Sequence, residues 1–99
     1  MKRFILLLFL GLSGLLAQDI EKALKLYEAN KFAKAYKLFE DLCEKDNPRA
    51  CFSLGYMNEK AQGVSKDLKK AHRFYDKACK FGYPKGCSNL ALSLEENGY

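Results

Sequence analysis

The sequence contains a single histidine, His72, among its 99 residues. A metal-dependent enzyme needs several histidines or other clustered ligands, so we predict no metal site. The sequence supports a serine nucleophile no better than it supports a metal-dependent enzyme. No serine is followed by lysine three residues later, the spacing that sets a general base one helical turn from the nucleophile. We therefore assign no catalytic residues and expect no cofactor.

Long apolar runs are also missing, except at the N-terminus. There Lys2 and Arg3 precede an apolar stretch that ends in small residues, the pattern of a signal peptide. The 14 residues from Phe4 to Ala17 would span about 21 Å as a helix, short of the roughly 30 Å hydrocarbon core. We expect a signal peptide over residues 1–17 and no stable membrane span. The mature domain, 18–99, would then be exported, either to the periplasm or as a secreted protein.

The chain has no strong excess of charge. Its formal net charge is +5, and it falls to +3 when Lys2 and Arg3 are removed. So small a surplus gives little attraction to nucleic acid, and we predict no such partner. A basic stripe is nevertheless placed on one side of a predicted helix by steps of three, four and seven residues: Lys66, Lys69, Lys70, Arg73, Lys77 and Lys80. It is either a solvated outer face or a surface for acidic or carboxylate-bearing partners.

What the sequence does contain is a repeat with a period of 36 residues. The matched positions include Lys34/Lys70, Ala35/Ala71, Cys43/Cys79, Pro48/Pro84, Cys51/Cys87, Leu54/Leu90 and Glu59/Glu95. A period in the mid-thirties with helical patterning predicts stacked helix pairs rather than a single globular core. We predict an all-α fold, an α/α solenoid of antiparallel helix pairs, with helices over residues 19–30, 32–45, 48–60, 66–81 and 84–96.

Apolar residues at helical spacing predict which side chains are buried. Ala35, Ala71 and Ala78 stand where two helices must approach closely, with Phe39 and Tyr75 filling the neighbouring gaps. The last predicted helix is expected to bury Cys87, Leu90 and Leu94. Ser65 is expected to cap the helix over 66–81.

The four cysteines form two pairs with a spacing of eight residues. On one continuous helix this spacing corresponds to about 12 Å, too far for a disulfide. Turn signals at Asn47-Pro48 and at Gly82 and Pro84 fold the chain back between the cysteines of each pair. We therefore predict the disulfides Cys43–Cys51 and Cys79–Cys87, the local connectivity among the three that are possible. A zinc site is the alternative, although its ligand pairs usually stand two to four residues apart and export favours oxidation.

The stretch Ala50–Gly86 resembles the Sel1-like repeat. The residues that carry the resemblance are Leu54-Gly55-Tyr56-Met57, Gln62-Gly63-Val64, Asp67, Lys70-Ala71, Phe74-Tyr75, Lys77-Ala78 and Gly82. The added cysteines are similar to those of the secreted Helicobacter-type cysteine-rich protein family, and Ala23–Phe39 has the rhythm of a tetratricopeptide unit. The resemblance implies one disulfide per repeat and a role in protein contacts outside the cytoplasm. The first copy departs from the family pattern, because Asp46 replaces its glycine.

Three functions are compatible with these features. The leading hypothesis is an exported, disulfide-stabilised scaffold whose curved surface binds other proteins or cell-wall peptides. The resemblance also implies a β-lactamase or penicillin-binding hydrolase, although none of Ser53, Ser65, Ser88 and Ser93 has the required lysine. The third hypothesis is a subunit of a larger or self-associating repeat assembly. Its contact would lie at the C-terminal end near Leu90, Leu92 and Leu94, which has no obvious polar cap.

Overall fold

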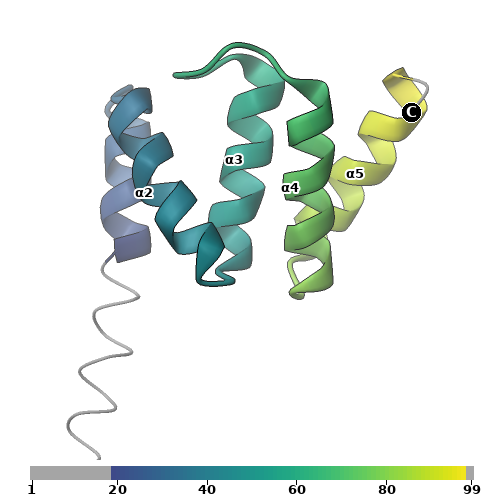
Figure 1. Cartoon of the computed structure of the whole chain (residues 1–99), viewed down its shortest axis with the longest axis horizontal. Coiled ribbons are helices and arrows are strands. Elements are labelled where there is room, and N and C mark those ends of the chain that lie inside the picture. Colours follow the sequence, from purple (N-terminus) through teal and green to yellow (C-terminus); the bar gives the residue numbers. More distant parts are fainter. Residues whose placement is uncertain (1–18, 98–99) are drawn as a thin grey trace, which may run out of the picture.

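The computed structural model describes residues 19–97, which contain five helical segments and no strand. Residues 19–28 are helical, and four further helices follow: α2 (Phe32–Glu44), α3 (Pro48–Lys60), α4 (Leu68–Lys80) and α5 (Pro84–Asn97). The helices alternate in direction and stand side by side along the molecule (Figure 1). This arrangement confirms the predicted solenoid of antiparallel helix pairs. The expected signal peptide over 1–17 lies outside the described residues.

Helix caps build the turns between neighbouring helices. Asn47 precedes α3, where its side-chain Oδ1 accepts the backbone N–H of Ala50 at 3.1 Å and Pro48 takes the first helical position. Four helices are followed within two residues by a residue with positive φ, and the N–H groups there bond back to carbonyls of the last turn. These residues are Asn30, Asp46, Ala61 and Gly82. The turns hold consecutive helices antiparallel.

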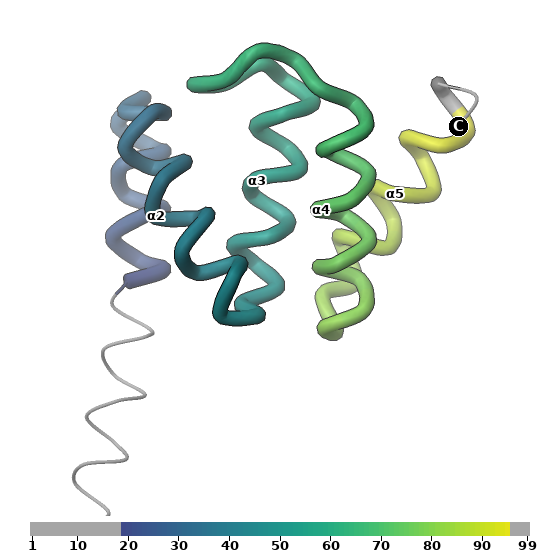
Figure 2. The backbone as a smooth tube through the Cα atoms, viewed as in Figure 1, coloured from purple at the N-terminus to yellow at the C-terminus, as the bar shows by residue number. Residues whose placement is uncertain are grey.

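The fourth helix begins later than the sequence predicts. Asp67, and not Ser65, caps it, because the Asp67 carboxylate accepts the N–H of Lys70 at 3.0 Å. The backbone N–H of Asp67 also donates to the carbonyl of Asn58 at 3.0 Å, which fixes the cap against α3. Lys66 therefore belongs to the loop over residues 61–67, which reaches back toward α2 before α4 begins (Figure 2).

The core combines small and large side chains, as the apolar spacing predicts. The alanines of the repeat and two aromatic residues are completely buried: Ala35, Ala71, Ala78, Phe39 and Tyr75. A polar group shares this core. Asn58 donates its side-chain N–H groups to the Tyr36 hydroxyl at 3.0 Å and to the Leu54 carbonyl at 2.8 Å, so it ties α3 to α2. The burial of Tyr36 and Asn58 is not apparent from the sequence pattern.

One disulfide lies in each repeat. Cys43–Cys51 joins α2 to α3 and Cys79–Cys87 joins α4 to α5, with Cα–Cα distances of 4.8 and 4.7 Å. No cysteine is free in the part of the chain that the structure describes. Within residues 19–97, no helix has the length and apolar character needed to cross a membrane.

The last helix leaves exposed some residues that the sequence predicts to be buried. Cys87 is exposed, Leu94 is 37% exposed, and Leu90 is only partly buried. The residues one repeat earlier, Cys51 and Leu54, are 0% and 1% exposed. The difference arises because α3 packs between α2 and α4, whereas the main contact of α5 within the described residues is with α4.

Candidate functional site

A groove with a volume of ≈ 260 Å³ opens on the solenoid. Its walls come from the helix over 19–28, from α3, and from the start of α5 with the turn before it. We call it the aromatic groove; it is lined by Leu24, Tyr27, Arg49, Phe52, Ser53, Tyr56, Tyr83 and Lys85. Small-molecule sites usually have volumes of roughly 300–1,000 Å³, so this groove suits side chains of an extended partner better than an enclosed ligand.

Ring contacts hold the aromatic walls in place. The Phe52 ring lies 5.6 Å from that of Tyr75 and 5.2 Å from that of Tyr83, between centroids. On the opposite wall the Tyr27 hydroxyl donates to Gln62 Oε1 at 2.8 Å, and its ring lies 5.3 Å from that of Phe32. Because these side chains are already ordered by the fold, a partner would lose little side-chain entropy in contacting them.

The charge of the aromatic groove has one sign. Arg49 and Lys85 line it, and none of its lining residues is acidic. Both cations follow a proline at the start of a helix, and they occupy equivalent positions 36 residues apart. Cations are electrostatically unfavourable at a helix N-terminus, so helix stability does not explain their placement. The arrangement attracts an anionic group to the groove.

The basic stripe that the sequence predicts lies elsewhere, since none of its residues lines the aromatic groove. Lys69, Lys70 and Arg73 are exposed on α4, and Lys66 is exposed in the preceding loop. Lys80 forms an ion pair with Asp76 at 2.9 Å.

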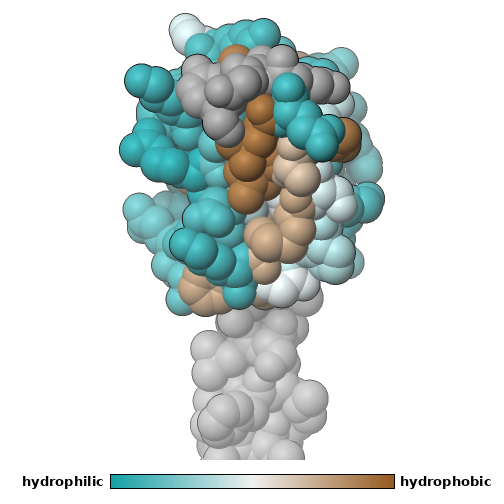
Figure 3. Space-filling view, turned by 90° about the vertical axis from the view of Figure 1, so that its right-hand side faces the viewer, coloured by the Kyte–Doolittle hydropathy of each residue, from teal (hydrophilic) through white to brown (hydrophobic). Residues whose placement is uncertain are grey.

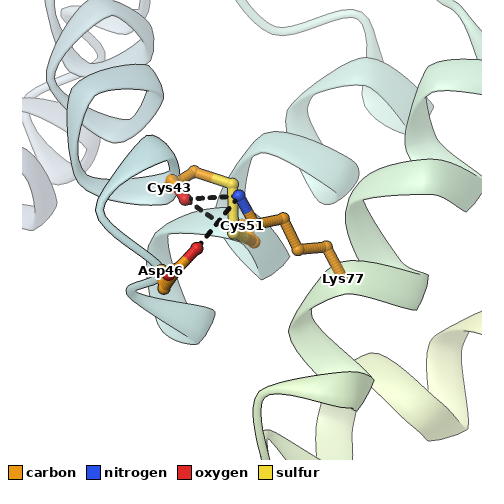
Figure 4. Close-up of polar contacts among 4 residues, drawn as sticks. All are labelled: Cys43, Asp46, Cys51 and Lys77. Carbon is orange, nitrogen blue, oxygen red and sulfur yellow. Dashed lines mark hydrogen bonds and ion pairs between the residues drawn. A yellow bond between two sulfur atoms is a disulfide. The ribbon is translucent and has the colours of Figure 1, made fainter.

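Lys77, another residue of the predicted basic stripe, contacts the end of α2. It reaches from α4 to the end of α2, where its Nζ donates to the Cys43 carbonyl at 2.8 Å and lies 3.4 Å from Asp46 Oδ1 (Figure 4). A lysine at this place donates a hydrogen bond to a carbonyl of the last turn of α2 that has no partner within the helix. Its positive charge also interacts favourably with the negative end of the α2 helix dipole.

Comparison with known proteins identifies the repeat. The family model of the Sel1 repeat matches residues 6–29 and 48–83, which together exceed half of the chain. The chain belongs to the Sel1 repeat family. The second matched range contains α3, the loop over 61–67 and α4, so one Sel1 repeat supplies the central wall of the aromatic groove.

Two similar proteins are considerably longer than this Sel1 repeat chain. "Putative beta-lactamase HcpC" of Helicobacter pylori strain J99 is 40% identical over 66 residues, which cover 62% of this chain and 23% of the relative. The crystal structure of a Sel1 repeat protein from Oxalobacter formigenes is 32% identical, with a TM-score of 0.72, and the match covers 80% of this chain and 32% of that one. The chain thus spans less than a third of either protein.

Serine chemistry of the kind that the relative's name suggests finds no support in the groove. Ser53 is the serine that lines it, but its Oγ donates to the Arg49 carbonyl of its own helix at 2.9 Å. Ser93 is buried, with its Oγ 3.5 Å from Glu59 Oε1. The described residues contain no group of three or more histidine, cysteine or acidic side chains that could hold a metal ion. What the groove offers is shape, aromatic surface and positive charge.

Sequence reasoning missed the aromatic groove because its members are scattered from Leu24 to Lys85. Aromatic residues at helical spacing usually indicate core, whereas the structure leaves Tyr27 partly exposed. One signal was available. Arg49 and Lys85 repeat a cation directly after the helix-starting proline, where the helix dipole disfavours it.

Proposed function

We propose that this protein is an exported Sel1 repeat scaffold that binds an extended, acidic segment of another protein in its aromatic groove. The observation that carries the proposal is the groove itself, where ordered rings lie beside two cations and no lining residue is acidic. Aromatic residues and arginine are the side chains that most often dominate binding energy at protein interfaces. A partner segment with alternating aromatic and acidic residues matches both features.

Export is supported by the chemistry of the cysteines. The two disulfides are of a kind that persists in oxidising compartments and is rare in the cytosol. The expected signal peptide over 1–17 agrees with them. The partner is therefore sought among periplasmic or secreted proteins and peptides of the cell envelope.

A peptide-binding measurement tests the function. The oxidised protein is titrated into a fluorescent peptide of alternating Glu and Phe residues, and into a matched peptide in which Lys replaces Glu. We expect binding of the acidic peptide only, weakening as salt is raised because charge attraction is screened. Replacing both groove cations, Arg49→Gln with Lys85→Gln, should weaken binding at least tenfold.

The basic stripe provides the matched control. The double substitution Lys69→Gln with Lys70→Gln removes the same charge from exposed positions outside the groove. Affinity should change less than twofold in this variant. If the stripe substitutions weaken binding and the groove substitutions do not, the binding surface lies on α4. Equal binding of the acidic and basic peptides would contradict the proposed partner chemistry.

A further inference from the structure

Each cation of the aromatic groove lies inside a loop that a disulfide closes. Arg49 belongs to the loop closed by Cys43–Cys51, and Lys85 belongs to the loop closed by Cys79–Cys87. Each cation stands two residues before the second cysteine of its pair. A bridge removes conformational freedom from the loop between its cysteines. The oxidised cysteines therefore restrain the positions of both charges that line the groove.

The loop closed by Cys79–Cys87 contributes more of the groove than the other loop does. It carries Tyr83 as well as Lys85, and both line the groove. Its remaining attachments are noncovalent. The backbone N–H of Tyr83 donates to the Ala78 carbonyl at 2.9 Å. Gly86 packs closely on α4, where a Cβ at this position would lie 2.8 Å from that of Ala78.

Few buried side chains attach α5 to the rest of the described structure. Among residues 84–95, whose burial the structure describes, Gly86 and Ser93 are the buried ones. In α3, six residues are buried, with Leu54 and Met57 among them. Figure 3 faces the end of the molecule that carries α5 and shows apolar surface open there between hydrophilic residues. The bridge to α4 therefore supplies a larger share of the attachment of α5 than the other bridge supplies for α3.

We propose that the Cys79–Cys87 bridge is a redox switch of the aromatic groove, which holds Tyr83 and Lys85 in place for the partner only when it is oxidised. This inference rests on the proposed function and adds the regulation of the same site. Cys87 is exposed and Cys79 is partly buried, whereas the cysteines of the other bridge are buried. A thiolate can therefore reach the switch while Cys43–Cys51 stays intact.

The switch operates by thiol–disulfide exchange with a dithiol reductant. One thiolate of the dithiol attacks the sulfur of Cys87, forms a mixed disulfide and releases the Cys79 thiolate, which takes up a proton. The second thiolate of the dithiol then attacks its own sulfur in the mixed disulfide, and Cys87 is released in the same way. The dithiol loses two electrons and two protons and leaves as a disulfide, and Cys79 and Cys87 become thiols.

Peptide binding before and after selective reduction tests the switch. Dithiothreitol is added until an alkylated aliquot, mapped by mass spectrometry, shows Cys79 and Cys87 labelled and the other bridge intact. We expect the affinity for the fluorescent peptide of alternating Glu and Phe to fall at least fivefold, and glutathione disulfide to restore it by re-forming the bridge. The variant Cys79→Ser with Cys87→Ser should bind with the weakened affinity and no longer respond to the reductant. Unchanged affinity after reduction would overturn the switch.

Amide hydrogen exchange tests the switch without any partner. Asn47 is the matched control for Tyr83, because its N–H donates to the Leu42 carbonyl at 3.0 Å, one repeat before the bond from Tyr83 to Ala78. Reduction of Cys79–Cys87 should speed exchange at Tyr83 at least tenfold and leave Asn47 unchanged. Faster exchange at both positions would reveal general unfolding, and no change at either would show a rigid loop. Both results overturn the switch.

Failure of the switch and failure of the proposed function give different results. Oxidised protein that does not bind the acidic peptide contradicts the function, and with it the regulation that rests on it, before any reductant is added. Oxidised protein that binds the peptide equally well after reduction keeps the function and overturns the switch alone.

Discussion

At the scale of the residue, the helix ends show the same turn made from different amino acids. Asn30, Asp46, Ala61 and Gly82 all have positive φ, between 56° and 93°. Glycine adopts this conformation without strain and asparagine tolerates it, whereas alanine does so at a cost of about 1 kcal/mol or more. Asp46 obtains partial compensation, because its carboxylate lies 3.4 Å from Lys77 Nζ. The side chain of Ala61 is a methyl group, which cannot form an ion pair of this kind.

We therefore expect Ala61→Gly to stabilise the protein. Relief of the left-handed strain should outweigh the greater flexibility of glycine in the unfolded chain, for a net gain of about 0.5–1 kcal/mol. In a domain of this size that gain raises the melting temperature by about 2–6 °C. Thermal unfolding followed by far-UV circular dichroism measures it.

The neighbouring residue supplies the control. Lys60 is the last residue of α3, so Lys60→Gly should lower stability by up to about 1 kcal/mol. If Ala61→Gly lowers the stability of the protein as Lys60→Gly does, the left-handed conformation of Ala61 does not strain the folded state.

The residue scale also shows what the sequence could and could not predict. Gly82 and Asn30 are predicted helix stops, because both residue types favour positive φ. Nothing about alanine signals that Ala61 is left-handed. Ser65 and Asp67 are both good caps, and the choice between them depends on the bond from Asp67 to the Asn58 carbonyl. That bond is tertiary, so local sequence could not decide the helix start.

At the scale of the element, the two disulfides differ in their surroundings. Cys43 and Cys51 are 4% and 0% exposed, and Lys77 of α4 reaches across to the Cys43 carbonyl beside them. Cys87 is exposed and Cys79 is partly buried, because among the described helices α5 packs mainly against α4 alone. The same cysteine spacing therefore yields one protected bridge and one accessible bridge.

We expect Cys79–Cys87 to be reduced first. A thiolate must reach a sulfur atom to attack it, and Cys43–Cys51 becomes accessible only when the surrounding core opens. In dilute dithiothreitol at low micromolar protein, alkylation and peptide mapping should label Cys79 and Cys87 at least tenfold faster than the other pair. Equal rates for the two pairs would mean that α4 does not protect the first bridge.

At the scale of the whole molecule, the solenoid was predictable and the aromatic groove was not. Repetition fixes the helices and their pairing, because each match such as Cys43/Cys79 or Pro48/Pro84 constrains both copies. The groove depends on how far one repeat rotates relative to the next. That rotation brings Tyr27 and Lys85 to one surface, and it is set by contacts such as the close approach of Gly55 to Tyr75.

Tyr75 joins three helices of the molecule. It belongs to α4, its ring lies over Gly55 of α3, and its carbonyl would be 2.9 Å from a Cβ at Gly86 of α5. Burial raises the pKa of Tyr75 to about 12 from 10.0. The Asn89 side chain acts in the opposite direction and lowers the pKa, and the Glu59 carboxylate adds to the increase.

This raised pKa makes the stability of the whole fold sensitive to alkali. Below pH 10 the Tyr75 hydroxyl is protonated in both the folded and the unfolded chain, so it adds no pH dependence. Between pH 10 and about 12 the unfolded chain releases the proton while the folded protein keeps it, and stability falls by about 1.4 kcal/mol per pH unit.

Urea unfolding at about pH 8 and about pH 11.5 should show this loss. Tyr75→Phe keeps the ring over Gly55 and removes the ionisable hydroxyl, so its stability should fall less over the same interval. An equal fall in both proteins would place the alkaline sensitivity in other groups.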